Sequence, residues 1–311
     1  MRTVRYHRSG GPEVLAIDEV DPPEPGPGEL LVEVAAAGVS LPVVRQTRSA
    51  DSPWPLSPGG EVAGRVSALG PGVTGWTAGQ RVVSIAFGGA YAERAVVPVA
   101  FSTAIPDPIA DNTAVALLRN GQVALGALQA GAVALTDRVL VTAAAGGVGH
   151  LAVQLARALG GRDVVAAVGS PGKEAFLEEF GIATVLSYAE DAPAWDVSVD
   201  LVIDGAGGSA LTRGISALET FGRLVSFSAA GGTLEVNDLR VQSRRLIGFS
   251  IAHLARLAPQ QYAQNRETLW RLAATGAIRP AIHAELPLAD AADAHRIIEA
   301  RTNRGKIVLR P

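Results

Sequence analysis

The strongest restriction on the fold comes from a glycine-rich turn between a buried strand and a helix. Residues 139–141 are an apolar run typical of a buried strand, and the helix expected over 150–159 keeps one face apolar and small. Between them, Ala143, Gly146 and Gly149 have the spacing A-x-x-G-x-x-G. Small residues at this spacing allow a tight turn from strand to helix and let the backbone approach a pyrophosphate closely.

The turn predicts a dinucleotide site. The first N–H groups of the helix have no partner within the helix, and together with the helix dipole they attract a diphosphate. The alternative is a glycine-rich turn that binds nothing, but the position between a strand and an amphipathic helix favours binding. The candidate cofactor-binding residues of this turn are Ala145, Gly146, Gly147, Val148 and Gly149.

The segment after the second strand, 164–168, indicates which dinucleotide binds. Units that prefer NAD usually carry Asp or Glu about 20 residues after the turn, where the carboxylate accepts a hydrogen bond from the ribose 2′-OH. Here that position falls in residues 168–173, which contain no acid, and the next acid is Glu174. Ser170 can donate to a phosphate oxygen and Lys173 adds positive charge, so the sequence predicts NADPH. The alternative for Lys173 is an ordinary solvated surface lysine.

The chain changes character along its length. Its first part has short strands separated by Gly/Pro turns, at 30–34, 62–66 and 81–85, which indicates a partly open barrel. From residue 139 on, strands alternate with helices, which is typical of βαβ units and a parallel sheet. The later strands are expected at 184–186, 201–203 and 224–227, and the helices at 173–180, 260–274 and 291–300, before a last strand at 306–309.

Composition excludes several classes of function. The chain of 311 residues contains no Cys, which excludes disulfide scaffolds, thiolate zinc sites, iron–sulfur clusters and cysteine nucleophiles. Its net charge is −3 with no basic stripe, so we expect no nucleic-acid partner. No apolar run of about 18 residues occurs and the N-terminus lacks the apolar core of a signal peptide, so we expect a cytoplasmic protein with no membrane partner.

Several segments together resemble the medium-chain dehydrogenase/reductase superfamily, in particular its zinc-independent quinone oxidoreductase branch. The resemblance covers nearly the whole chain and rests on the glycine-rich turn and on residues 6–15, 59–64, 88–93, 204–208 and 305–309. It implies an α/β fold in which a Rossmann doubly wound parallel sheet is inserted in a GroES-like β-barrel catalytic domain. The implied boundaries are 1–115 for the first part of the catalytic domain, 116–257 for the Rossmann domain and 258–311 for the C-terminal part.

The resemblance also implies a chemistry. Members of the branch transfer a hydride from NADPH to a small molecule, a quinone or an α,β-unsaturated carbonyl compound. They are commonly homodimers joined through the edges of the Rossmann sheet, and the edge candidate here is 246–251. Further cofactor positions carried over by motif are Tyr188, Ala206, Gly207, Ser228, Phe249 and Ser250. For Tyr188 the alternative is a half-buried surface residue, and for Phe249 it is a core residue.

No metal is expected. In the zinc-dependent branch a Cys follows Gly-Val and a His precedes the Glu of a G-H-E motif, and the matching positions here are Ser40 and Gly60. The five His residues are scattered with no ligand spacing. A zinc alcohol dehydrogenase is therefore a remote alternative.

The candidates for the catalytic side of the site are Ser40, Arg119 and Asn120. Arg119 can bind an anionic or phenolate-like group or form an interdomain salt bridge. Two departures from the family pattern, Val44 and Val123, place apolar side chains where polar groups are usual. The leading hypothesis is an NADPH-dependent quinone or enone oxidoreductase. The alternatives are a non-redox tailoring enzyme, such as a cyclase or dehydratase, and a cofactor-binding protein without turnover.

Overall fold

The computed structural model describes residues 1–49, 54–228 and 230–311. The chain forms two compact units, the first from 1–119 with 281–311 and the second from 120–280. This division differs from the predicted boundaries at 115 and 257. Helix α2 (Asp111–Ala130) runs through the first boundary, and the segment 258–280 belongs to the second unit.

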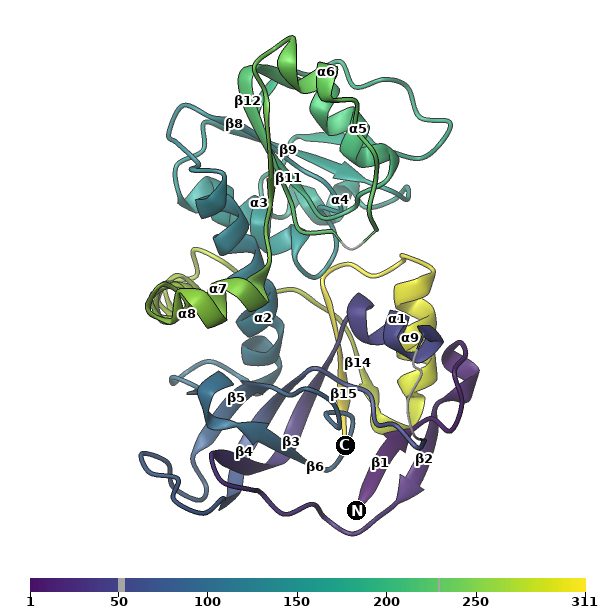
Figure 1. Cartoon of the computed structure of the whole chain (residues 1–311), viewed down its shortest axis with the longest axis vertical. Helices are drawn as coiled ribbons and strands as arrows, with labels where there is room; N and C mark the ends of the chain where they lie inside the picture. The colour runs from purple at the N-terminus through teal and green to yellow at the C-terminus, as the bar shows by residue number, and fades with distance from the viewer. Residues whose placement is uncertain (50–53, 229) are drawn as a thin grey trace. The chain divides into compact units, whose positions relative to one another are not determined.

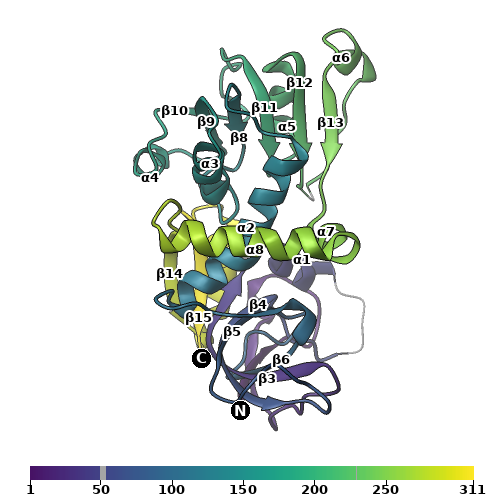
Figure 2. The ribbon, with the colours of Figure 1, turned by 90° about the vertical axis from the view of Figure 1, so that its left-hand side faces the viewer.

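The second unit is built on a six-stranded parallel sheet, whose strands lie side by side in Figure 2 in the order β10-β9-β8-β11-β12-β13. The first strand in the sequence thus lies in the middle, and the strand order reverses between β8 and β11, where ligands bind in folds of this kind. The predicted doubly wound sheet is confirmed. The strands are β8 (Arg138–Val141), β9 (Asp163–Val168), β10 (Thr184–Ser187), β11 (Val199–Asp204), β12 (Leu218–Ser226) and β13 (Arg245–Gly248).

Helices cover both faces of this sheet (Figure 1). Helix α3 (Gly149–Ala158) packs on β8 and β9, whereas α5 (Ser209–Ser216) packs on β11 and β12. Right-handed crossovers that run in opposite directions along a sheet put their helices on opposite faces. The central strands β8, β9 and β11 are consequently buried along most of their length. The remaining helices of this unit are α4 (Glu174–Glu178), α6 (Val236–Arg240), α7 (Ile251–Leu257) and α8 (Pro259–Ala274).

The first unit is a mostly antiparallel sheet in which the chain's two ends meet. Strand β15 (Lys306–Arg310) pairs antiparallel with β3 (Glu29–Val39), so the C-terminal segment completes the sheet begun by the N-terminal one. The order is β14-β15-β3-β4-β5-β7, and β6 pairs with β3. The other strands are β4 (Glu61–Leu69), β5 (Arg81–Ile85), β6 (Arg94–Pro98), β7 (Ser102–Ala104) and β14 (Ile282–Pro287), with β1 (Arg2–Arg5) and β2 (Ala16–Glu19) forming a separate pair.

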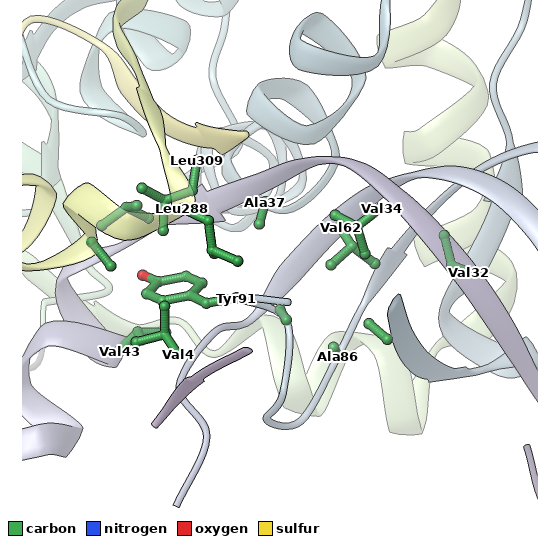
Figure 3. Close-up of a cluster of buried hydrophobic side chains, with 14 of the residues drawn as sticks. Val4, Val32, Val34, Ala37, Val43, Val62, Ala86, Tyr91, Leu288 and Leu309 are labelled. Atoms are coloured by element: carbon green, nitrogen blue, oxygen red, sulfur yellow. The ribbon is translucent and has the colours of Figure 1, made fainter. Parts of the chain in front are cut away.

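Figure 3 shows the core of this first unit. Apolar side chains from β3 and β4 meet Leu309 of β15 and the fully buried ring of Tyr91. Helices α1 (Leu41–Ser49) and α9 (Ala291–Glu299) contribute Val43 and Ala294 to the same core. The predicted GroES-like barrel is confirmed, and its core depends on residues from both ends of the sequence.

No helix in the described part of the chain has the length and apolarity needed to cross a membrane.

Candidate functional site

The glycine turn, residues 142–149, has the tight geometry that its sequence predicts. A Cβ atom on Gly149 would lie 2.1 Å from the carbonyl oxygen of Ala143 and 2.7 Å from the Cα of Ala144, so only glycine fits there. A Cβ on Gly146 would lie 3.2 Å from the same oxygen. Ala143 itself is left-handed, with a φ of +50°, a conformation that strains a residue with a side chain. Helix α3 has no side-chain N-cap hydrogen bond.

His150 stabilises this turn from inside. Its ring is buried, its Nδ1 lies 2.8 Å from the carbonyl oxygen of Gly146, and its backbone N–H donates to the same oxygen at 3.1 Å. A carbonyl oxygen only accepts, so the ring proton is on Nδ1. The rings of Phe176 and Phe180 pack against it. His150 therefore has a structural role in shaping the phosphate-binding turn.

A buried carboxylate, which the sequence analysis missed, ties the strand ends beneath the turn together. Asp204 accepts hydrogen bonds from the hydroxyl of Thr142 at 2.7 Å and from that of Ser226 at 2.9 Å. It also accepts the N–H of Gly207 at 3.0 Å and that of Ala206 at 3.2 Å. The ends of β8, β11 and β12 and the loop after β11 are thus held by one side chain. The sequence signal for it is weak: Thr142, Asp204 and Ser226 each stand at or next to the end of an expected strand.

Ser170, Lys173 and Tyr188 lie at the ends of β9 and β10. Lys173 is only 8% exposed, so it is not the solvated surface lysine of the alternative reading. The ring of Tyr188 lies directly on Gly169, because a Cβ there would come within 2.6 Å of its Cε2 and 3.1 Å of its Oη. The Tyr188 N–H donates to the carbonyl of Val168 at 3.0 Å. Tyr188, at the end of β10, and the segment after β9 therefore meet at Gly169.

The remaining cofactor candidates form two groups. Gly207 has a φ of +69°, and a Cβ on it would lie 2.9 Å from the Ser228 hydroxyl oxygen, so the loops after β11 and β12 meet there. Phe249 instead packs on α2, where a Cβ on Gly126 would lie 2.4 Å from its Cζ. The ring therefore has the packing role that was the alternative for it, and its contact with a cofactor stays a prediction. The same is true of Ser250, which is exposed.

The first unit contains a charged cluster of Glu61, Lys306 and Arg119. The Lys306 Nζ lies 2.5 Å from the Glu61 Oε2, and both side chains are buried. A Cβ on Gly38 would lie 2.4 Å from this oxygen, so a glycine in β3 leaves room for the pair. Burial lowers the pKa of Lys306, and the Glu61 carboxylate partly opposes that shift. The cluster was not anticipated from the sequence, because its members are distant in the chain.

Arg119 joins the cluster from α2. Its Nη1 lies 3.4 Å from the Glu61 Oε1, and a Cβ on Gly60 would lie 3.3 Å from that Nη1. Both partners belong to the first unit, whereas the predicted boundary at 115 put Arg119 in the Rossmann domain. The role of Arg119 as an anion-binding residue stays a prediction. Asn120, the next residue, is buried and is the first residue of the second unit.

Three further polar groups lie in the first unit. The Ser40 Oγ is buried and has no hydrogen-bond partner within the described residues. The Tyr91 hydroxyl lies 3.3 Å from the Nε2 of His295, and both side chains are buried. Burial lowers the pKa of His295 to about 4, whereas burial and then the charge of Glu61 raise that of Tyr91.

Within residues 1–49, 54–228 and 230–311, no three His, Asp or Glu side chains come together as a metal site would require.

Comparisons with known proteins agree with this architecture. The models of the alcohol dehydrogenase GroES-like domain and of zinc-binding dehydrogenases match residues 26–107 and 180–309. The chain is 30% identical to quinone oxidoreductase 1 of Escherichia coli, over 99% of both chains. The chain belongs to the quinone oxidoreductase branch of the medium-chain dehydrogenase/reductase superfamily.

Two other matches extend this result. A mycobacterial protein solved in complex with NADPH has a TM-score of 0.91 and 32% identity to this chain, over 100% of both chains. A mycocerosic acid synthase-like polyketide synthase of Mycolicibacterium smegmatis is 29% identical over 92% of this chain, which spans only 14% of that relative. The predicted membership of the quinone oxidoreductase branch is confirmed, while the role of each site residue stays a prediction.

Proposed function

We propose that this member of the quinone oxidoreductase branch is an NADPH-dependent, zinc-independent oxidoreductase of the cytoplasm that reduces a quinone or an α,β-unsaturated carbonyl compound. The observation that carries the proposal is that Lys173, only 8% exposed, lies in the segment after β9, and that residues 168–173 contain no acid. A cation that has left bulk water at this point favours a doubly charged phosphate over a ribose hydroxyl.

The residues present fit NADPH. Gly149 and Gly146 let the turn fold tightly against Ala143, and the first N–H groups of α3 would hold the diphosphate. Ser170, Lys173 and Tyr188 would hold the adenosine-side phosphate. Bound NADPH supplies a hydride from C4 of its nicotinamide ring. The loops ending β11 and β12, with Ala206, Gly207 and Ser228, would lie beside the nicotinamide half, and so would Phe249 and Ser250 after β13.

The substrate side needs donors rather than a nucleophile. When a hydride adds to a quinone or enone, negative charge develops on the substrate oxygen, and nearby N–H or O–H donors stabilise it. The Ser40 hydroxyl has no protein partner in the described residues, which leaves it able to donate to such an oxygen. Arg119 is proposed to bind an anionic group of the acceptor, and Asn120 stays a candidate.

The charges of the first unit support the proposal that no zinc is needed. The carboxylate of Glu61 already has two cationic neighbours, Lys306 and Arg119, and a divalent cation beside it would be repelled by both. Ser40 and Gly60 offer no imidazole or thiolate ligand. Metal analysis of the purified protein is expected to find less than about one zinc per ten chains, and full activity is expected after dialysis against a chelator. Stoichiometric zinc would contradict this part of the proposal.

Coenzyme titration tests the main proposal. We expect fluorescence titration to give at least tenfold tighter binding of NADPH than of NADH, and absorbance at the reduced-nicotinamide band to fall with a quinone or enone panel. Lys173→Met should weaken NADPH binding about tenfold and leave NADH binding unchanged, because one charge-assisted contact is lost. Arg94→Met, at an exposed position of β6, is the matched control for loss of one cation. Equal affinity for the two coenzymes would refute the assignment, and tight binding without turnover would support the non-redox alternatives.

We also propose a homodimer. Strand β13 has β12 as its neighbour on one side and no strand on the other within the described residues, and Leu246 on it is 45% exposed. An uncovered sheet edge with an apolar residue favours pairing with a second copy. Sedimentation equilibrium is expected to give twice the chain mass, and Leu246→Lys is expected to shift the protein toward the monomer.

A further inference from the structure

The charged cluster of Glu61, Lys306 and Arg119 contains one carboxylate and two cations. The main partner of Glu61 is Lys306: the Lys306 Nζ lies 2.5 Å from the Glu61 Oε2, and both side chains are buried. Arg119 has only the other carboxylate oxygen, at 3.4 Å through a single Nη1. A guanidinium has five donors arranged as a fork, and its strongest contacts are bidentate. Arg119 therefore uses only one of its donors on Glu61, at a long distance. With two cations and one carboxylate, the cluster has a net positive charge.

The Arg119 head group is also reachable. Its side chain is 26% exposed, unlike those of its two cluster partners, and within the described residues its only ion pair or hydrogen bond is the one to Glu61. Gly60 makes space for it, because a Cβ there would lie 3.3 Å from Nη1. The buried carboxylate thus fixes one edge of the guanidinium while the other donors stay available. A small oxyanion with two acceptor atoms would complete the fork.

We infer that Arg119 is a specificity-determining residue that selects acceptors carrying a carboxylate group. This inference rests on the proposed function, since it names the substrate class of the same site. Glu61 and Lys306 act behind it, holding the guanidinium in place and supplying the excess positive charge. A neutral acceptor of the same shape would leave that charge without a partner, so the site would discriminate against it.

Matched pairs of acceptors test the inference. We suggest cinnamaldehydes with a ring carboxylate at the ortho, meta or para position, each paired with its methyl ester, assayed with NADPH. The wild-type kcat/KM is expected to be at least tenfold higher for one of the acids than for its ester. In Arg119→Met this ratio is expected to fall 10- to 100-fold, the loss typical of one charge-assisted contact, and Arg119→Lys should restore part of it. A loss common to acid and ester cancels in the ratio.

A binding measurement separates this inference from the proposed function. Calorimetry with benzoate and methyl benzoate needs no turnover, so it reports on Arg119 even if no acceptor is reduced. We expect benzoate binding to the wild type, a loss of at least tenfold in Arg119→Met, and no change in Arg94→Met. An acid-to-ester ratio near one in the wild type together with no benzoate binding would overturn the inference. Equal benzoate affinity in Arg119→Met and the wild type would overturn it as well.

Discussion

The glycine turn of the second unit and the charged cluster of the first unit are both proposed to bind anions. The turn is built from backbone groups, whereas the cluster is built from side chains. In the turn, backbone N–H groups and the missing side chains of Gly146 and Gly149 provide the geometry. In the cluster, Glu61, Lys306 and Arg119 provide it with ionised side chains that come from three separate segments. A backbone site depends on local spacing, whereas a side-chain site depends on the whole barrel. The two sites should therefore respond differently to substitution.

The largest expected effect is that of Glu61→Gln. It leaves Lys306 buried without a counter-charge, which should cost about 3–5 kcal/mol of the free energy of unfolding. Urea unfolding at pH 7 measures this. The matched control is the double variant Glu61→Met/Lys306→Met, which removes both charges and should unfold within about 1 kcal/mol of the wild type. A single variant as stable as the wild type would contradict the view that this site depends on charge pairing.

Gly149→Ala should affect the turn next most strongly. Its Cβ would meet the backbone at 2.1 Å, so helix and turn must separate, at a cost of about 3 kcal/mol. We also expect NADPH affinity to fall about 100-fold, measured by fluorescence titration. Gly146→Ala, with its nearest contact at 3.2 Å, is the graded control and should lose much less. If both variants bind NADPH like the wild type, the backbone account of the turn is wrong.

A pH effect distinguishes the first unit further. The unfolded chain binds a proton on His295 near pH 6.5, whereas burial holds the folded pKa at about 4. The unfolded state therefore binds more protons in this window, and stability falls as the pH drops from about 6.5 to about 4. Between pH 7 and pH 5 the loss from this group should be about 2 kcal/mol.

The His295 prediction is checked by urea unfolding at both pH values. His295→Gln keeps a hydrogen-bond partner for the Tyr91 hydroxyl and cannot titrate, so it should lack this part of the pH dependence. Because the other carboxylates are the same in both proteins, the difference between them isolates His295. If the free energy of unfolding of the two proteins depends on pH in the same way, His295 does not cause the loss of stability.

The smallest effect is expected at Ala143. Its left-handed backbone costs about 1 kcal/mol, and Ala143→Gly relieves this while adding entropy to the unfolded chain. The net result should be a stabilisation of about 0.5 kcal/mol. NADPH affinity should stay within about twofold. A clear loss of stability in thermal unfolding would show that the methyl group of Ala143 makes contacts that outweigh the strain.

Prediction from sequence succeeded where the information is local. Strand β5 was placed at its observed bounds, and α3 and β9 within one residue, because apolar runs and glycine spacing determine them. Helix α2 was not predicted. Its apolar residues surround the helix without one polar face, as expected for a buried segment, so no amphipathic period marks it.

The candidate site divides in the same way. The glycine turn and Lys173 could be predicted from the spacing of residues in the sequence. Asp204 and the charged cluster could not. Asp204 is a common residue at a strand end, and only its partners Thr142 and Ser226 in neighbouring strands make it a structural centre. Lys306 and Glu61 are 245 positions apart, so only the pairing of β15 with β3 brings them together. Phe249 also needed the structure, since Gly126 provides its packing site.

The way Asp204 is bound has a consequence for how this protein can be re-engineered. One carboxylate accepts hydrogen bonds from two hydroxyls and two loop amides below the proposed dinucleotide site. A substitution at any one of these residues should therefore disturb the others. Ser170 and Lys173 follow β9, which is not one of the three strands whose ends Asp204 joins, so they form the rim of the proposed site. Redesign of coenzyme preference should therefore begin at the rim and leave the residues bonded to Asp204 intact.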